Sequence, residues 1–356
     1  MAELIVDISK LKHNIHFVRT LCARHAVELV AVAKGCNAYP PVIQAFQESG
    51  IALIGFSRVA DASKVEASLQ RRPCFISIPS PGQAESVTRY FRSSLNSEKD
   101  TIRALADAAE RGSRVHGILL MVDIGDLREG VTPEQVLPMA RFILELNSPF
   151  IEFLGLGATL ACCSGTLPDE QNLGLLQDLA NETERASGHE IRTVSIGGSV
   201  ILPWIERGSL PSRINQARMG EAILLGTIPA TGERHEALHP DVFVLRGTIL
   251  EVKEKSSKPT GTLGTDVFGQ RLALVDRGPR LRCILDFGMI DTYPKGLTPA
   301  LKSLEFINSN SDYTIVDATG IDRQLRPGDS FDFYPNYQAL IRAFQAPYLR
   351  RTVTGV

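Results

Sequence analysis

The sequence lacks the features that mark several classes of protein. No apolar run reaches the roughly 18 to 20 residues of a membrane-spanning helix, and there is neither a long Lys/Arg run nor a CxxC pair. The formal net charge is −2 over 356 residues, whereas proteins that bind nucleic acid or anionic membranes usually carry a basic excess. We therefore expect a small-molecule partner, with no nucleic acid and no membrane.

Cysteine and histidine are few and are not spaced as metal ligands. All seven histidines lie at or before His239, so the last third of the chain has none, and we predict no metal site. Near the start, Asp7, Lys10 and Lys12 fall at helical spacing, which argues against a signal peptide. We expect reduced thiols in a cytoplasmic protein. The cysteines are at positions 22, 36, 74, 162, 163 and 283.

Short apolar runs alternate with amphipathic helical segments from residue 10 to about 228. Near-continuous apolar strands between helices are typical of a parallel sheet that is buried on both faces. Eight units in about 220 residues fit a closed (β/α)8 barrel better than an open sheet. We place this barrel at residues 9–230. The expected strands are 29–34, 51–57, 74–79, 90–96 (the weakest), 117–125, 151–160, 193–199 and 217–226.

The pattern changes after Gly232. Short strand-like runs such as "DVFVLRGTILEVKE", "RLALVDRG", "LRCILDFGM", "YTIVDATG" and "DSFDFYP" follow one another with Gly, Pro and Asp turns and little helix. This predicts a second, smaller and mostly antiparallel β domain over 231–356. The opening "AELIVDI" is also strand-like, and we assign residues 1–8 to the same domain. The predicted class is thus α/β, a TIM-like barrel followed by a β domain.

Lys34 ends the first expected barrel strand, "LVAVAK". The carboxyl ends of barrel strands carry the active sites of such folds. A lysine in an apolar mouth loses hydration, which favours the neutral amine that attacks carbonyl groups. That is the chemistry of a Schiff base with pyridoxal phosphate. Taken alone, a lysine that extends from a strand end into solvent is the simpler interpretation.

Four segments together resemble the alanine racemase superfamily of pyridoxal phosphate enzymes. "AKGCNAY" around Lys34 is similar to the family's lysine segment, and three further motifs follow in the family's order: "VDIGDLREG" (122–130), "SIGGS" (195–199) and "INQARMGEAILLG" (214–226). "GDLREG", "NQARMGEAILLG" and "LIRAFQAPY" look like the subgroup of ornithine and lysine racemases. The resemblance covers essentially the whole chain.

The resemblance implies the fold, the reaction and the assembly. It implies racemisation of a free amino acid, with pyridoxal 5'-phosphate as cofactor and Lys34 as both Schiff-base lysine and one proton-transferring base. A basic substrate, ornithine, lysine or arginine, is expected. The resemblance further implies a head-to-tail homodimer with shared active sites.

Two arginines occupy motif positions of the family. Arg128 is implied to contact the cofactor ring oxygen or the substrate carboxylate, because a fixed guanidinium binds such oxygens bidentately. Arg218 is implied to face the pyridine nitrogen. The alternatives are structural ion pairs, of Arg128 with Asp126 or Glu129, and of Arg218 with Glu221.

The cofactor phosphate is implied to bind Ser199 and the backbone around Gly220 and Glu221. Glycines followed by serine at a helix start can form an anion-binding nest, although most such tripeptides are plain turns. Tyr337 in "PNYQALIRAF" is a further phosphate candidate, with core packing as its alternative. One extra residue separates Lys34 from Tyr39 compared with the family, so that family tyrosine's role is not assigned to Tyr39.

Inversion at Cα needs a second acid or base on the opposite face. The family supplies a tyrosine from the β domain of the partner subunit, but the matching position here falls on Met289, which transfers no proton. We rank Asp291 first as its substitute and Tyr313 second. Tyr293 and Asp312 are further candidates from the same domain. Asp291 could equally be a turn aspartate. Cys162 is weighed as a pocket residue against an inert buried thiol.

Three other functions are compatible with parts of the sequence pattern. A metal-assisted aldolase of this plan needs β-domain ligands, and the absence of histidine there argues against it. A decarboxylase would rely on a C-terminal cysteine and aspartate, for which Cys283 alone is thin support. A non-catalytic pyridoxal phosphate carrier resembles the barrel alone, whereas this chain has about 120 further residues.

A basic substrate would also need an acidic partner, for which Asp126, Glu129 and Asp291 are candidates.

Overall fold

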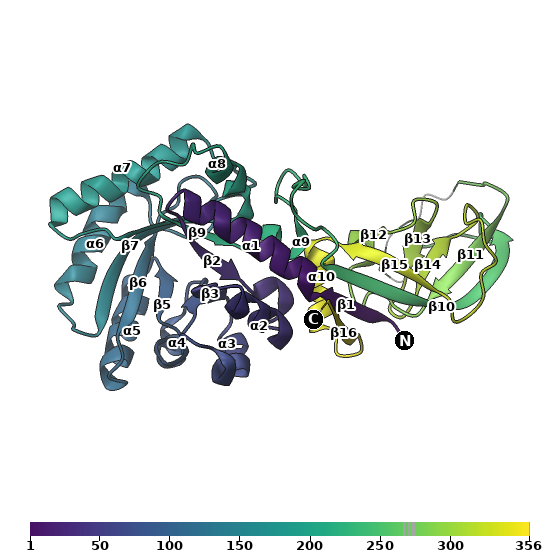
Figure 1. The fold of residues 1–356 in the computed structure, drawn as a ribbon, viewed down its shortest axis with the longest axis horizontal. Helices are drawn as coiled ribbons and strands as arrows, with labels where there is room; N and C mark the ends of the chain where they lie inside the picture. Colours follow the sequence, from purple (N-terminus) through teal and green to yellow (C-terminus); the bar gives the residue numbers. More distant parts are fainter. Residues whose placement is uncertain (266–267, 270, 272–274, 356) are drawn as a thin grey trace. The chain divides into compact units, whose positions relative to one another are not determined.

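The computed structural model describes residues 1–265, 268–269, 271 and 275–355 (Figure 1). They form two compact units, residues 10–240 and residues 1–9 with 241–356. The division lies ten residues beyond the expected boundary at 230. The extra residues belong with the first unit because they bond to its first helix: Asn14 exchanges hydrogen bonds with the backbone of His239, and the rings of Phe17 and His235 lie 5.1 Å apart.

The first unit is a closed barrel of eight parallel strands, which confirms the predicted (β/α)8 fold. Adjacent strands pair in sequence order, and β9 pairs with β2 to close the ring. The weak strand expected near 90–96 is present as β5. The barrel strands are β2 (Glu28–Val32), β3 (Leu53–Phe56), β4 (Cys74–Phe75), β5 (Ser93–Asn96), β6 (His116–Met121), β7 (Ile151–Thr159), β8 (Thr193–Gly197) and β9 (Gln216–Met219).

Helices surround the barrel strands in Figure 1. Helix α5, for example, buries one apolar stripe, with Ile102, Leu105 and Ala109 at spacings of three and four. The helices of this unit are α1 (Ile8–Arg24), α2 (Pro40–Glu48), α3 (Val59–Val65), α4 (Ala84–Tyr90), α5 (Lys99–Arg111), α6 (Val136–Glu145), α7 (Glu170–Ser187), α8 (Leu202–Glu206) and α9 (Glu221–Leu225).

The last expected strand, 217–226, is half strand and half helix. Strand β9 stops at Met219, Gly220 precedes α9, and Gly226 ends that helix with a left-handed φ of 62°. Residues Ala222 to Leu225 are all buried. A short helix that is apolar on every side has no periodicity to separate it from a buried strand, so the sequence pattern was ambiguous here.

The second unit is an antiparallel β domain, as predicted. Strand β1 joins it, pairing antiparallel with β10 and parallel with β16. The strand expected in "RLALVDRG" (271–278) falls partly outside the described residues. The elements are β1 (Glu3–Asp7), β10 (Phe243–Ser256), β11 (Pro279–Leu285), β12 (Leu297–Pro299), β13 (Glu305–Ser309), β14 (Thr314–Asp317), β15 (Ser330–Pro335), α10 (Tyr337–Gln345) and β16 (Arg350–Thr354).

Buried aromatic rings form the core of the β domain. Phe243 packs edge-on against Phe344 of α10, and Phe287 packs edge-on against Phe333, each pair with ring centroids 5.5 Å apart. Across the described part of the chain, no helix has the length and apolarity needed to span a membrane. All six cysteines are free thiols. The cytoplasmic location stays a prediction.

Candidate active site

Lys34 lies two residues beyond β2, as the first residue of a 3-10 turn, η1 (Lys34–Cys36). The chain then reverses sharply through Asn37 and Ala38, which have left-handed φ values of 49° and 48°. Behind the turn, the thiol of the fully buried Cys36 donates to the carbonyl of Ala33 at 3.2 Å. The turn therefore fixes the base of Lys34 just beyond the carboxyl end of the strand, which stops two residues before the expected end at Lys34.

The pKa of the Lys34 ammonium is lowered, chiefly because surrounding protein atoms displace water from the amine. The side chain is nevertheless exposed by surface area. The lowered pKa and the exposure are compatible when an amine is surrounded by protein atoms on most sides and open to water on one side. Arg128 and Arg218 lower the pKa further, while Cys162 and Glu129 raise it. The local environment thus favours the neutral, nucleophilic amine.

Arg218 is a buried cation held by neutral acceptors. It is 6% exposed and donates to Ser195 Oγ at 2.6 Å, to the Ala158 carbonyl at 2.8 Å and to Thr159 Oγ1 at 3.2 Å. Burial lowers its pKa to about 10, with Glu129 acting in the opposite direction. Arg218 therefore keeps its charge near neutral pH.

The first glycine of "SIGGS" makes room for that guanidinium. A Cβ on Gly197 would lie 2.5 Å from Arg218 Nη2 and 3.1 Å from Thr159 Oγ1, so a side chain there would displace the arginine. The next residue, Gly198, has φ +111°, which L side chains rarely adopt. The sequence predicted that a group approaches the backbone closely at these glycines. At Gly197 that group is the side chain of Arg218.

A hydrogen-bonded chain connects the two arginines. Arg128 Nε lies 2.6 Å from Glu129 Oε2, and Thr159 Oγ1 donates to Glu129 Oε1 at 3.1 Å while it accepts from Arg218. The ion pair expected as the alternative for Arg128 is thus present with Glu129. Thr159 and Ser195 were not among the predicted residues. Thr159 is the last residue of β7, and that carboxyl-end position was the available signal.

Ser199 connects the loops after β8 and β9. It begins the 3-10 turn η5 (Ser199–Ile201), and its Oγ accepts from the Ala222 amide at 3.0 Å. Gly220 and Glu221 open α9, where the first N–H groups have no partner within the helix. The Glu221 carboxylate accepts from Thr227 Oγ1 at 2.9 Å rather than pairing with Arg218, and burial raises its pKa.

The predicted residues of the β domain differ in accessibility. Asp291 is 7% exposed, and its carboxylate accepts from the Gly288 amide at 3.0 Å within the same turn. Burial raises the pKa of Asp291. Tyr313 is 43% exposed. This arrangement matches the turn role that was the alternative for Asp291.

Tyr313 belongs to a turn that is hydrogen bonded to the Met289 segment. The Met289 amide donates to the Asn310 carbonyl, and the Asn310 amide donates to the Tyr313 carbonyl, each at 2.9 Å. Within this domain, Tyr313 therefore lies near the position where the family motif expects a tyrosine. Tyr337 is partly buried and begins α10, directly after the capping residue Asn336.

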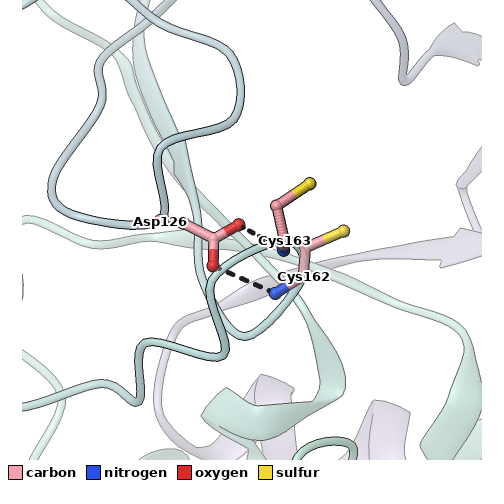
Figure 2. A group of neighbouring side chains, drawn as sticks. All are labelled: Asp126, Cys162 and Cys163. Carbon is pink, nitrogen blue, oxygen red and sulfur yellow. Dashed lines mark hydrogen bonds between the residues drawn. The ribbon is translucent and has the colours of Figure 1, made fainter.

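Asp126 fixes the loop that follows β7. Its buried carboxylate accepts from the amides of Cys162 at 3.1 Å and Cys163 at 3.0 Å (Figure 2). It also accepts from Ser164 Oγ at 3.1 Å. Cys162 is exposed, so it does not match the alternative of an inert buried thiol. The Asp126 carboxylate is thus engaged by its own unit, and Glu129 is engaged by Arg128.

The charges around Lys34 suit an anionic ligand that carries a reactive carbonyl. Arg128 lowers the pKa of both Lys34 and Arg218, and Glu129, which carries the counter-charge, raises the pKa of both. The acceptors around Arg218 are neutral. An anionic ligand would relieve the excess positive charge, and the neutral amine could attack its carbonyl carbon.

Residues 6–227 match the family model described as alanine racemase, N-terminal domain. The chain is 34% identical to ornithine racemase of Acetoanaerobium sticklandii, over 98% of each chain, and 29% identical to lysine racemase of Thermotoga maritima, over 98% of this chain and 97% of that one. Its fold matches alanine racemase from Bartonella henselae with covalently bound pyridoxal phosphate, with TM-score 0.73, 16% identity and 99% coverage of both chains. The resemblance found in the sequence is confirmed, and the chain belongs to the alanine racemase family.

Proposed function

We propose that the protein racemises a basic free amino acid, ornithine, lysine or arginine, with pyridoxal 5'-phosphate as cofactor. The observation that carries this proposal is the lowered pKa of Lys34 beside a connected pair of guanidinium groups. The two curated relatives, named for ornithine and lysine racemisation, support a basic substrate. The chain aligns with nearly their full length, so both domains are included in the comparison.

The residues present fit the cofactor. Lys34 Nζ would hold it covalently, and Ser199 with the backbone at Gly220 and Glu221 would bind its phosphate, since helix starts present unpaired N–H groups. Tyr337 of the β domain is a further proposed phosphate contact. When bound, pyridoxal phosphate acts as an electron sink for the negative charge that develops at Cα.

Arg218 would tune that sink. Its guanidinium is fixed by hydroxyl and carbonyl groups, and a permanent cation at the pyridine nitrogen disfavours protonation of that nitrogen. A weaker sink suits reversible proton exchange and limits side reactions. Arg128, oriented by Glu129, is the proposed donor to the ring oxygen or to the substrate carboxylate.

Racemisation requires two proton-transferring groups, one for each face of Cα. Lys34 is the proposed group for one face. For the other we now favour Tyr313 over Asp291, because the tyrosine is exposed beside the Met289 segment and the aspartate is buried in its own turn. Asp291 remains the second candidate, since its raised pKa would let it carry a proton.

We also propose a head-to-tail homodimer in which the β domain of one subunit completes the site of the other. Mixing inactive Lys34→Ala and Tyr313→Phe subunits tests this arrangement. If sites are shared, half of the re-formed dimers contain one intact site, which restores about a quarter of wild-type activity. No recovery after proven subunit exchange would contradict a shared site.

The function itself is tested by spectroscopy and chiral analysis. Purified wild-type protein should show the visible absorption band of a lysine-linked cofactor, and Lys34→Ala should lack it. Wild type incubated with L-ornithine, L-lysine or L-arginine should form D-product faster than with L-alanine.

Three results would change the proposal. A cofactor band without D-product from any amino acid would point to a carrier role, and loss of carbon dioxide from the substrate would indicate a decarboxylase. Equal rates for ornithine and alanine would remove the preference for basic substrates. Absence of a band, even after cofactor is added, would overturn the central proposal.

A further inference from the structure

Two neighbouring thiols project from the loop after β7, at the carboxyl end of the barrel. Cys162 and Cys163 are both exposed free cysteines. Their sulfur atoms and a carboxylate oxygen of Asp126 all lie within 4.8 Å of one another. In Figure 2 the two Sγ atoms lie on the same side of the loop, and the backbone amides of the same two residues face the Asp126 carboxylate. The proposed racemase function assigns no role to this pair.

The loop that carries the thiols is ordered by hydrogen bonds from both sides. The amides of Cys162 and Cys163 each bond one oxygen of the Asp126 carboxylate, which is 1% exposed. Ser164 Oγ donates to the same carboxylate at 3.1 Å, and Thr166 Oγ1 donates to the Gly125 carbonyl at 2.8 Å. A loop held in this way loses little further entropy when a ligand joins its side chains.

We propose that Cys162 and Cys163 bind a thiophilic divalent cation, Zn²⁺ or Cd²⁺, with Asp126 as the nearest third ligand. Thiolate sulfur selects such cations over hard ones. Binding exchanges the two thiol protons for the metal and involves no oxidation or reduction. Asp126 Oδ1 accepts from the Cys162 amide and from Ser164 Oγ, whereas Oδ2 accepts from the Cys163 amide and keeps a second lone pair that could bind a metal.

The site is an open one with reversible occupancy. Two sulfurs and one oxygen leave at least one position of a tetrahedral cation open. The neighbouring positive charges of Lys34 and Arg128 act against a divalent cation and keep the affinity below that of a closed structural zinc site. The cation would therefore bind reversibly and would not be needed for folding.

Occupancy would inhibit the enzyme. Lys34 lies just beyond β2 and the two exposed thiols lie on the loop after β7, so all three are at the carboxyl end of the barrel. A cation on the two sulfurs would place a bulky, positively charged group at that end. This consequence rests on the proposed racemase function, whereas the binding of the cation does not.

Cadmium titration of the reduced, cofactor-loaded protein tests the binding. Cd–thiolate bonds absorb in the ultraviolet by charge transfer, so one Cd²⁺ per subunit should develop that band. Cys162→Ser and Cys163→Ser should each weaken binding by at least about tenfold, the smallest loss that even an outer partner of a metal site causes. Cys74→Ala is the matched control, since it removes a thiol inside the barrel and should leave the titration unchanged.

Zn²⁺ inhibition tests the consequence. Zinc should inhibit racemisation by wild type and Cys74→Ala reversibly, with recovery after a chelator, and the two serine variants should resist it at least about tenfold more. A wild-type protein without the charge-transfer band, or serine variants that bind cadmium as wild type does, would overturn the site. Binding without inhibition would overturn only the inhibitory role. Failure of metal-free protein to racemise would count against the proposed function and leave the titration result standing.

Discussion

The barrel and the β domain carry their candidate residues in different ways. In the barrel, Arg128, Glu129, Thr159 and Arg218 form one connected chain of hydrogen bonds, and their charges reach Lys34. In the β domain, the carboxylate of Asp291 is engaged within its own turn, and Tyr313 is exposed on the neighbouring turn. The barrel's chemistry is therefore defined by geometry inside one unit.

The contrast indicates that the two units have different roles in the proposed reaction. A connected set of polar groups that ends on a buried arginine fixes orientation, because each member restrains the next. An exposed tyrosine on a turn has no such restraint until something packs against it. We infer that the barrel prepares the cofactor site, whereas the β domain supplies one proton-transferring group to an already ordered site.

Replacing Lys34 should have the largest effect, because this residue is central to the candidate site in the barrel. Lys34→Ala loses both the cofactor bond and one base, so racemisation should fall by at least about 10³-fold, and the visible cofactor band should disappear. Chiral chromatography and absorption spectra measure the two effects. Retention of the band in this variant would assign the cofactor to another lysine.

Removing the β-domain acid should come next. Tyr313→Phe should slow racemisation by about 10²- to 10³-fold, while Asp291→Asn should cost less than about tenfold. Cofactor absorption should stay as in wild type for both. In D₂O, Tyr313→Phe should still exchange the α-proton of one enantiomer through Lys34 and fail with the other, an asymmetry that damage to the fold would not produce. The reverse ranking would return the role to Asp291.

The sequence predicted the barrel well because parallel strands buried on both faces leave a strong apolar pattern. It predicted Lys34 from its place after such a strand. It could not separate β9 from α9, since Ala222 to Leu225 are buried on every side. It also could not find Thr159 and Ser195 as partners of Arg218, because these contacts join strands that meet only when the barrel closes.

The phosphate side of the barrel should give a smaller effect. Ser199→Ala removes the proposed phosphate contact and the hydrogen bond to the Ala222 amide. One charge-assisted hydrogen bond is worth about 1.5 kcal/mol or more, so the cofactor dissociation constant should rise about tenfold. Equilibrium dialysis of the cofactor measures the change, and Ser209→Ala on the exposed surface is the control. An unchanged constant would remove Ser199 from the phosphate site.

The smallest expected effect is a shift in the pKa of Lys34 when a neighbouring charge is removed. The shift has opposite signs for Arg128 and Glu129. Arg128 lowers the pKa of Lys34, so Arg128→Gln should raise that pKa. Glu129 raises it, so Glu129→Gln should lower it. The reactive amine is the neutral form, so cofactor incorporation into the cofactor-free protein speeds up as pH rises through the Lys34 pKa.

The midpoint pH of that incorporation rate is therefore the readout. It should lie below the value of about 10.4 for an ordinary lysine in wild type, move to higher pH in Arg128→Gln, and move to lower pH in Glu129→Gln. Arg111→Gln is the matched control, because that arginine is exposed and pairs with Glu85. Shifts of the same sign in both test variants would mean that they act on the fold of the site, and that the charges of Arg128 and Glu129 do not set the state of Lys34.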